Sequence, residues 1–230
     1  QKKHRNNTKQ FIVEGFHLVE EAYKNNSLRT VLSTDEELLS KFNNIRTIKV
    51  NQPILEKLSN TTTPQNILGV AAMPDNHFEL SDRYLILDDV NDPGNVGTII
   101  RTSLALGVKN LILSNNTVDI YNDKVVRATQ GAIFKAKIYY TDLKEIYEIL
   151  KKNNIKIIVT SLEANKTLNE LERIDKFAIV VGNEANGISE VSNNFADEKI
   201  IIPIKNNIES LNVAVATAIT LYGVMNKWVF

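Results

Sequence analysis

The sequence predicts an α/β protein with two domains, a small first domain and a larger second domain built on a parallel sheet. The chain has 230 residues, enough for one large or two small domains, and its 43% apolar and 23% charged residues are ordinary for a globular protein. Strand-like runs alternate with helix-like runs, which favours parallel strands covered by helices. A polar segment at residues 75–82 interrupts this alternation, and we therefore place the domain boundary there.

The first domain is expected to alternate short strands with short helices. Phe16, Val19 and Ala22 recur at helical spacing and predict one amphipathic helix. The basic start of the chain is interpreted either as a solvated terminus or as an anion-binding segment. The expected elements are strands at 11–13, 28–32, 45–50 and 67–72 and helices at 16–24, 36–42 and 54–58.

The second domain begins with a buried-type strand and ends with a long, mainly apolar helix. Gly107 is expected to stop the first helix of this domain, since glycine readily adopts the left-handed conformation found after helix ends. The expected elements are strands at 84–87, 110–113, 155–159, 177–181 and 199–204 and helices at 96–106, 143–152 and 211–228.

The composition excludes several classes of site. There is no Cys, so no disulfide, thiol nucleophile or Cys-ligated metal is possible, and only three His are present, which argues against a His-rich metal site.

No run of 18 apolar residues exists, so no membrane association is expected. The polar start is no secretory signal, and its lack of an initiator Met suggests that native residues precede it. We expect a cytoplasmic protein. The net charge of +0 says little about partners.

Three loops at the carboxyl ends of predicted strands could bind a ligand, as such loops do in open α/β sheets. In the first, a strand leads through Asp88 and Asp89 into a Pro-Gly turn and a helix. Asn95 can cap that helix or hold a polar ligand group. Arg101 offers a planar set of donors suited to phosphate, or is a surface side chain. The two adjacent aspartates are interpreted as strand-end polar groups that point to opposite faces.

The second and third loops each contain one polar residue of particular interest. Glu184 follows the buried strand at 177–181, where it could face a cleft or cap the helix that begins near Ser189. In the third loop Ser210 is expected to be the N-cap of the last helix. Asn212 then lies just inside an apolar helix, which suggests a hydrogen-bonding role or a second capping contact.

Other chemistries fit the sequence less well. A Ser-His-Asp hydrolase needs a histidine near its nucleophile, yet none lies beyond His77, and there is no Gly-x-Ser-x-Gly elbow. The glycine spacing matches neither a dinucleotide fingerprint nor a P-loop, which disfavours a nucleotide-binding dehydrogenase.

Together the three loops resemble the SpoU/TrmH family of the SPOUT superfamily, which are RNA 2′-O-ribose methyltransferases. The family's three motifs are similar to residues 95–102 (NVGTIIRT), 181–189 (VGNEANGIS) and 202–216, which contain IPI and SLNVAVA. Residues 126–134 (VRATQGAIF) resemble a further family segment. Ala185 departs from the pattern, because the family usually has Gly there. The resemblance covers roughly residues 83–226.

The resemblance implies a small α/β RNA-binding domain at 1–78 and a trefoil-knotted methyltransferase domain with a parallel sheet at 79–230. The segment FIVEG at 11–15 is similar to the start of the first domain in such proteins. The family further implies a homodimer, S-adenosylmethionine as cofactor and an RNA substrate. Small residues on the closing helix at Ala214, Ala216 and Ala218 are compatible with dimer packing and equally with a tight core.

The resemblance also assigns roles to individual residues. Arg101 is expected to orient phosphate and to stabilise the developing alkoxide, with a role as base left open, and Glu184 is expected to pair with Arg101 or its neighbours. Catalytic roles are implied for Asn95, Arg101, Glu184, Ser210 and Asn212. Cofactor contacts are implied for Thr160, Ser161, Leu162, Gly182, Ile202 and Leu211. RNA contacts are expected from Arg5, Arg127 and Lys135, with Lys2, Lys3 and Lys137 in support.

The predicted function is therefore transfer of a methyl group from S-adenosylmethionine to a ribose 2′-hydroxyl. The presence of the additional first domain favours ribosomal RNA as the substrate. The same chemistry on transfer RNA is the nearest alternative. A non-catalytic RNA-binding or assembly protein with this fold is a further alternative, which the presence of Arg101, Glu184 and Asn212 disfavours.

Overall fold

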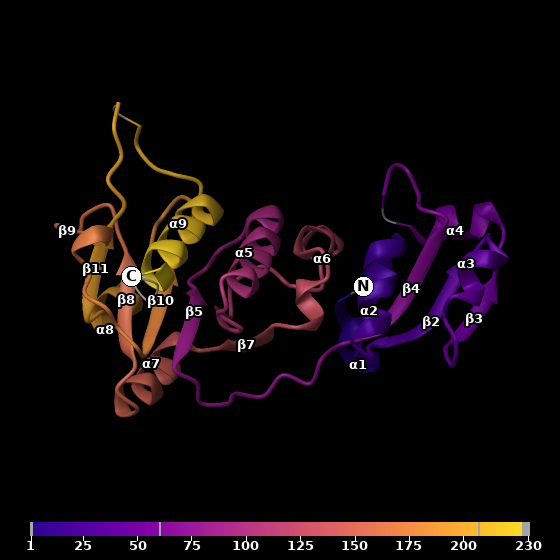
Figure 1. Ribbon diagram of the computed structural model, residues 1–230, viewed down its shortest axis with the longest axis horizontal. Coiled ribbons are helices and arrows are strands. Elements are labelled where there is room, and N and C mark those ends of the chain that lie inside the picture. The colour runs from indigo at the N-terminus through magenta and orange to yellow at the C-terminus, as the bar shows by residue number, and fades with distance from the viewer. Residues whose placement is uncertain (1, 60, 207, 227–230) are drawn as a thin grey trace. The chain divides into compact units, whose positions relative to one another are not determined.

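The computed structural model describes residues 2–59, 61–206 and 208–226, and the chain forms two compact units (Figure 1). The first unit contains the residues up to Asp75 together with Tyr121–Lys135, and the second contains Asn76–Ile120 and the residues from Ala136 onward. The first unit thus ends close to the expected boundary after residue 78. It also includes Tyr121–Lys135, here called the inserted segment, which the sequence prediction assigned to the second domain.

The first unit is built on a four-stranded mixed sheet in the order β1-β4-β2-β3. Strand β4 is antiparallel to both β1 and β2, whereas β2 and β3 are parallel. Every strand and helix predicted for this region is present. Its elements are α1 (Lys2–Thr8), β1 (Gln10–Glu14), α2 (Phe16–Lys24), β2 (Leu28–Ser33), α3 (Glu36–Ser40), β3 (Arg46–Lys49), α4 (Gln52–Leu58) and β4 (Ile67–Ala72), with α6 (Asp123–Thr129) and the 3-10 turn η1 (Ala132–Phe134) from the inserted segment.

The basic start of the chain is helical. The sequence pattern predicts no element there, yet α1 spans Lys2–Thr8. None of its residues is buried, so this helix remains a charged surface feature.

The inserted segment packs against strand β1, at the edge of the first sheet. Phe11 is buried and its ring lies 4.8 Å from that of Tyr121 and 5.7 Å from that of Phe134, measured between centroids. Lys135 forms a 2.6 Å ion pair with Glu21 of α2. Aromatic packing and an ion pair together place this segment in the first unit.

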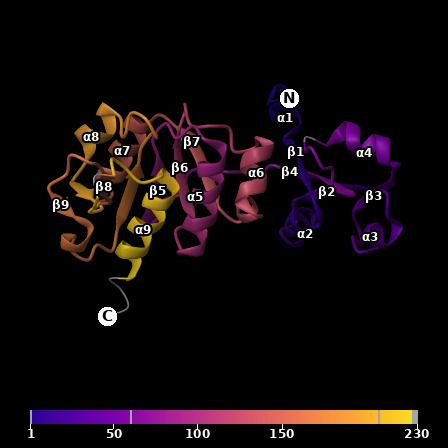
Figure 2. The ribbon, with the colours of Figure 1, turned by 90° about the horizontal axis from the view of Figure 1, so that it is seen from above.

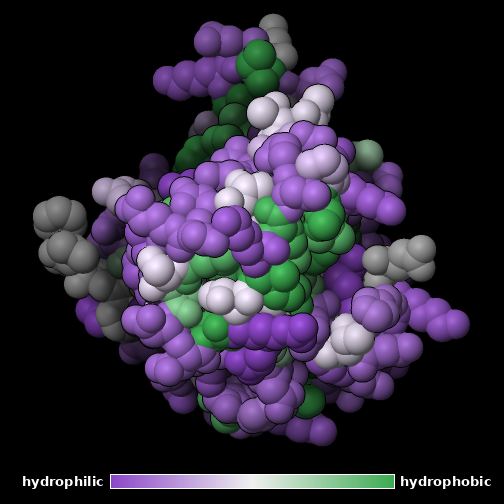
Figure 3. Space-filling model, turned by 90° about the vertical axis from the view of Figure 1, so that its right-hand side faces the viewer, coloured by the Kyte–Doolittle hydropathy of each residue, from purple (hydrophilic) through white to green (hydrophobic). Residues whose placement is uncertain are grey.

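Figure 3 views the first unit from the right-hand side of Figure 1 and shows hydrophobic residues surrounded by hydrophilic ones. Among the described residues of this unit, four large apolar side chains are more than a third exposed. They are Ile12, Phe16, Ile54 and Leu58.

The second unit contains a seven-stranded sheet in the order β7-β6-β5-β10-β8-β11-β9, in which all paired strands are parallel. The expected fold class, an α/β protein with a parallel sheet in its second domain, is confirmed. Its elements are β5 (Arg83–Leu87), α5 (Pro93–Ala105), β6 (Asn110–Ser114), β7 (Lys137–Thr141), α7 (Leu143–Lys152), β8 (Lys156–Thr160), β9 (Lys166–Thr167), the 3-10 turn η2 (Leu168–Glu170), β10 (Phe177–Val181), α8 (Glu190–Phe195), β11 (Glu198–Ile201) and α9 (Val213–Asn226).

Helices cover both faces of this sheet, with α7 and α8 on one side and α5 and α9 on the other (Figure 2). All five residues of β10 are buried, which explains why its sequence is uniformly apolar rather than alternating. Among the described residues, Tyr84, Tyr147 and Phe177 are the largest of the fully buried side chains. No helix in the described ranges is long and apolar enough to cross a membrane.

Several element ends differ from the sequence prediction for identifiable reasons. Helix α5 begins at Pro93 rather than 96, because the Asp92 side chain caps it and proline is favoured in the first turn. The strand predicted at 199–204 ends at Ile201, before Pro203. Gly107 adopts a φ of +83°, as expected for the residue after a helix.

Helix α9 begins at Val213, two positions later than predicted, and the predicted end at 228 lies outside the described residues. The helix packs against α5, β10 and η2. A Cβ on Gly223 would lie 2.7 Å from Leu168 Cδ2, so the backbone of α9 approaches η2 closely. The helix that the resemblance expects to thread a loop therefore packs against the connection between β8 and β10.

Candidate functional site

The three loops that sequence analysis selected meet at the carboxyl ends of the strands of the second unit. Strands β5 and β10 are neighbours, with Leu87 opposite Val181, so the loops that follow them start side by side. The first loop, residues 88–92, leads into α5, and the second, residues 182–189, leads into α8. The third, which follows β11 and includes Asn212, leads into α9.

A chain of hydrogen bonds through Asn95 joins all three loops. The Asn95 Nδ2 group donates to Glu184 Oε1 at 2.9 Å, and Asn95 Oδ1 accepts from Asn212 Nδ2 at 2.9 Å. The backbone N–H groups of Asn91 and Asp92 also donate to the Glu184 carboxylate, at 3.4 and 3.3 Å. The structure thus brings three of the predicted catalytic side chains into direct contact.

These bonds keep Glu184 ionised. Burial alone would raise the pKa of this carboxyl, but hydrogen bonds from the Asn95 side chain and from the backbone of Glu184, Asn91 and Asp92 outweigh it and lower the pKa below its ordinary value. The alternative that Glu184 caps α8 is wrong, because Ser189 occupies that position and accepts from Ser192 N at 3.2 Å.

Asn212 has both of the roles predicted as alternatives for it, a capping contact and a side-chain hydrogen bond. Its Oδ1 accepts from the backbone N–H groups of Ala214 and Val215 at 2.9 and 3.3 Å, which makes it the cap of α9. Its Nδ2 meanwhile bonds to Asn95. The prediction that Ser210 caps this helix is wrong, because the helix begins too late for Ser210 to reach its first N–H groups. Ser210 is exposed.

The loop after β10 is folded tightly on itself. Asn183 and Gly187 exchange two backbone hydrogen bonds at 2.8 and 2.9 Å. The Asn183 side chain accepts from the backbone of Ala185 and Asn186. A Cβ on Gly182 would lie 2.3 Å from the carbonyl carbon and oxygen of Gly187, so only glycine fits at that position.

Arg101 is exposed on α5, and no hydrogen bond or ion pair to another described residue occupies its guanidinium. Glu184 was expected to pair with Arg101 or with its neighbours. It bonds to Asn95, which lies on the same helix as Arg101, and the described contacts include none between Glu184 and Arg101 itself. An exposed guanidinium on the helix that carries Asn95 is suited to bind an anionic group.

The residues expected to contact a cofactor lie at the carboxyl ends of β8, β10 and β11 or just before α9. Thr160 Oγ1 donates to the carbonyl of Val180, and Ser161 N donates to that of Ile200. Leu162 is 61% exposed. Among the described contacts, none uses the backbone groups of the half-buried residues Ile202 and Leu211, which leaves them able to bind a ligand.

The residues expected to contact RNA lie in the first unit, except for Lys137. Arg5 is on α1, Arg127 on α6 and Lys135 just after η1. Arg127 forms a 2.9 Å ion pair with Asp123 one turn earlier, and Lys135 pairs with Glu21. In the second unit, Lys137 pairs with Glu79.

Sequence reasoning missed two residues that organise the site. Asp92 caps α5, accepting from Asn95 N at 2.7 Å, although Asn95 was considered for that role. The Asp-Pro pair at 92–93 is a typical helix start and could have identified it. Asn183 organises the loop after β10, and no local pattern distinguishes it from other loop asparagines.

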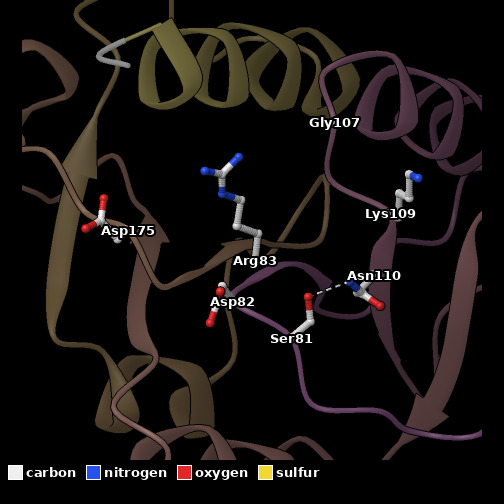
Figure 4. A pocket seen from close by; sticks show the side chains of 7 residues that line it. All are labelled: Ser81, Asp82, Arg83, Gly107, Lys109, Asn110 and Asp175. Carbon is white, nitrogen blue, oxygen red and sulfur yellow. Dashed lines mark hydrogen bonds between the residues drawn. The ribbon is translucent and has the colours of Figure 1, made fainter.

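A separate polar cavity of about 500 Å³ lies at the opposite edge of the sheet, at the amino ends of its strands (Figure 4). It is lined by Ser81, Asp82, Arg83, Gly107, Lys109, Asn110 and Asp175. A 2.9 Å hydrogen bond joins two of these lining residues, Asn110 and Ser81. Ligands of open α/β sheets bind at the carboxyl ends of strands, so we take the three-loop cluster as the candidate site.

Across the described ranges, no cluster of His, Asp or Glu could hold a metal ion.

The chain matches two protein families. The SpoU rRNA Methylase family matches residues 82–222, and the MRM3-like substrate binding domain matches residues 1–69. The chain is 34% identical over 224 residues to the 23S rRNA (guanosine(2553)-2′-O)-methyltransferase RlmP of Bacillus subtilis, covering 96% of this chain and 90% of the relative. It is also 34% identical over 157 residues to the 23S rRNA (guanosine-2′-O-)-methyltransferase RlmB of Escherichia coli K12, covering 67% and 65%.

Two solved structures resemble the whole chain. One is a TrmH-family RNA methyltransferase, described as putative, from Porphyromonas gingivalis, with a TM-score of 0.90, 27% identity and coverage of 99% of this chain and 94% of the other. The other is an AdoMet-bound rRNA methyltransferase from Sinorhizobium meliloti, with a TM-score of 0.87, 28% identity and coverage of 100% and 92%.

Proposed function

The chain belongs to the SpoU rRNA methylase family, and we propose that it transfers the methyl group of S-adenosylmethionine to a ribose 2′-hydroxyl of ribosomal RNA. The observation that carries this proposal is the hydrogen-bonded chain Glu184–Asn95–Asn212, which unites the three family motifs at one edge of the sheet.

The residues present suit S-adenosylmethionine. Gly182 permits backbone packing that any side chain would prevent, and the backbone groups of Ile202 and Leu211 are available to hydrogen-bond an adenosyl group. Thr160, Ser161 and Leu162 would line the same edge. When bound, the sulfonium supplies an electrophilic methyl group, so the protein has to position the substrate and manage one proton.

Arg101 is the residue proposed to act on the RNA. Because arginine side chains do not act as proton acceptors in proteins, the proposed role is electrostatic: the guanidinium holds a phosphate and stabilises the alkoxide that develops at the ribose oxygen. Asn95 has its amide fixed by Glu184 on one side and Asn212 on the other. A rigid amide near the start of α5, the helix that also carries Arg101, would orient the ribose without having to reorganise during the reaction.

Ribosomal RNA is the proposed substrate because the relatives RlmP and RlmB are named for activity on 23S rRNA. Both names specify guanosine, so guanosine is the first target to test. The match of residues 1–69 to an MRM3-like substrate binding domain supports RNA binding by the first unit, through Arg5, Arg127 and Lys135. This activity would take place in the cytoplasm.

We further propose a homodimer that packs through α9. Val215, Ile219 and Tyr222 recur at helical spacing on this helix and are 49%, 39% and 62% exposed. An apolar stripe of this kind on a surface helix is typical of an interface. Tyr222→Asp should yield a monomer in sedimentation experiments, whereas an unchanged sedimentation coefficient would contradict this interface.

The function can be tested by incubating the purified chain with labelled S-adenosylmethionine and with ribosomal or transfer RNA from cells that lack the gene. Label in 23S rRNA, mapped to one 2′-O-methylated nucleotide, is the expected result. Label in transfer RNA alone would replace the rRNA proposal with the tRNA alternative. Absence of both cofactor binding and transfer would favour a non-catalytic RNA-binding role.

A further inference from the structure

Asp88 is a buried carboxylate that the proposed chemistry does not use. It follows directly after β5 and is only 2% exposed. Burial of a carboxylate is costly unless strong hydrogen bonds compensate for it. Its surroundings therefore indicate what it contributes.

Both strong contacts of Asp88 reach the far end of the loop after β10. Its Oδ2 accepts from the backbone N–H of Ser189 at 2.7 Å and from Ser192 Oγ at 2.6 Å. Ser189 is the residue at which that loop ends and α8 begins. The Ser192 hydroxyl in turn lies 2.7 Å from the hydroxyl of the fully buried Tyr147.

The donors in this network are directed toward Asp88. Burial raises the pKa of the Tyr147 hydroxyl, which therefore keeps its proton and can donate to Ser192. Ser192 is then free to donate its single hydroxyl proton to the carboxylate. The result is a buried anion satisfied by a backbone amide and a hydroxyl chain.

The near end of the same loop is held by the residue that follows Asp88. Asn183 Nδ2 donates to the backbone carbonyl of Asp89 at 2.8 Å. The loop is thus fastened at Asn183 and at Ser189 to two consecutive residues of the other loop. Glu184 and Gly187 lie between these two attachments.

We propose that Asp88 is a positioning residue, which sets the loop after β10 against the loop after β5 so that Glu184 reaches Asn95 and the backbone around Gly182 takes its cofactor-binding shape. This inference rests on the proposed function, because it assumes that the loop binds S-adenosylmethionine. Without the carboxylate, the attachment at Asn183 would remain but the end at Ser189 would be released.

The test compares Asp88→Ala, Asp88→Asn and Ser192→Ala. The side-chain carbonyl introduced by Asp88→Asn can still accept both bonds, so that variant should bind S-adenosylmethionine within a few-fold of the wild type. Asp88→Ala should weaken cofactor binding by about tenfold or more, the scale expected for loss of hydrogen bonds to a charged group. Ser192→Ala, which keeps the Ser189 bond, should fall between the two. Calorimetric titration with S-adenosylmethionine measures each affinity.

Asp197→Ala provides a matched control. That carboxylate also accepts a backbone N–H, from Ile157 at 2.8 Å, and pairs with Lys151, but it lies at the amino ends of β8 and β11, on the opposite edge of the sheet. Its removal should lower the melting temperature and leave the cofactor affinity unchanged. If the role of Asp88 were purely structural, Asp88→Ala would behave like this control. Its melting temperature would fall, and its cofactor affinity at temperatures where it is folded would be unchanged.

Three outcomes overturn the inference: wild-type affinity in folded Asp88→Ala, equal losses in the Ala and Asn variants, or an equal loss in the Asp197 control. If Asp88→Ala does not fold, the cofactor affinities of the other variants decide. The inference then requires Ser192→Ala to bind S-adenosylmethionine more weakly than both Asp88→Asn and the Asp197→Ala control. A wild-type protein that binds no S-adenosylmethionine would instead reject the proposed function, and the two failures are thereby distinguished.

Discussion

Asn95 and Asn212 share a 2.9 Å hydrogen bond although 117 positions separate them in the chain. Each also has a second partner: Asn95 bonds to Glu184, and Asn212 caps α9. One pair of amides therefore links the beginning of α5, the loop after β10 and the beginning of the last helix.

Substitutions of Asn212 should separate its two roles. In Asn212→Ser the hydroxyl can still cap α9 but cannot reach Asn95, so stability should be nearly retained while methyl transfer falls. Asn212→Ala should lose both roles and cost about 1 kcal/mol of unfolding free energy in addition, as loss of a cap does. Urea unfolding and methyl-transfer assays measure the two effects. Equal activity of the Ser variant and the wild type would contradict the bridging role.

Arg101→Ala should leave the protein folded and its cofactor affinity intact. The side chain is exposed, so the change in unfolding free energy should stay within about 0.5 kcal/mol. Methyl transfer should fall by about two orders of magnitude or more, as when a charge-stabilising donor is removed. Single-turnover assays at saturating S-adenosylmethionine measure this. Near-normal turnover would reject the proposed role of Arg101.

Glycine substitutions in the loop after β10 should differ sharply. Gly182→Ala forces a Cβ within 2.3 Å of the Gly187 backbone, so the loop must open and cofactor affinity should fall strongly. Gly187→Ala meets no atom within 4 Å and has only the strain of a φ of +69°, about 1 kcal/mol. Calorimetric titration of both variants with S-adenosylmethionine checks the order. A larger loss in Gly187→Ala would show that the close contact is not what shapes the loop.

The pH dependence of stability should reveal the Glu184 hydrogen bonds. Because the pKa of Glu184 is lowered in the folded state, its contribution is present above the ordinary value of 4.5 and is lost as the pH falls through the folded pKa. Wild type should therefore be more stable than Glu184→Gln at pH 7, and the difference should shrink below about pH 4.5. Urea unfolding of both proteins between pH 3 and 7 measures it. A stability difference that does not change with pH would show that the ionised Glu184 carboxylate is not its cause.

RNA binding should depend on salt through the basic residues of the first unit. Arg127→Ala should weaken binding uniformly across RNA sequences and reduce the slope of log affinity against log salt by about one. Lys135→Ala removes a charge and also the ion pair with Glu21, so it should lower stability as well. Filter binding at several salt concentrations, with unfolding of both variants, separates these effects. An unchanged slope in Arg127→Ala would place the RNA elsewhere.

Local patterns in the sequence were sufficient to predict most elements of the fold. The strand at 177–181 and the helix at 143–152 follow from runs and periodicities of apolar residues, and both are present at those bounds. The end of α5 follows from Gly107 alone. Helix α1 was missed because its sequence is polar throughout and lacks the apolar periodicity that marks a packed helix.

Individual contacts at the site could not be predicted in the same way. The motifs placed Asn95, Glu184 and Asn212 in three separate loops, and sequence analysis left a capping alternative open for each. The structure gives the capping of α5 to Asp92 and that of α8 to Ser189, and gives Asn212 both tasks. Side chains with several possible partners select among them only when the loops are brought together.

The sequence by itself determined the two-domain α/β plan, the three polar loops and the residue types available for methyl transfer, because these depend on local periodicity, turn chemistry and motif spacing. The tertiary structure alone decided that Asn95 bonds to both Glu184 and Asn212, that Asp88 holds Ser189, and that Tyr121–Lys135 belongs to the first unit. The hydrogen bonds between the loops depend on strand order: β5 lies beside β10, far away in sequence, and a hydrogen bond forms only where the fold brings donor and acceptor within about 3 Å.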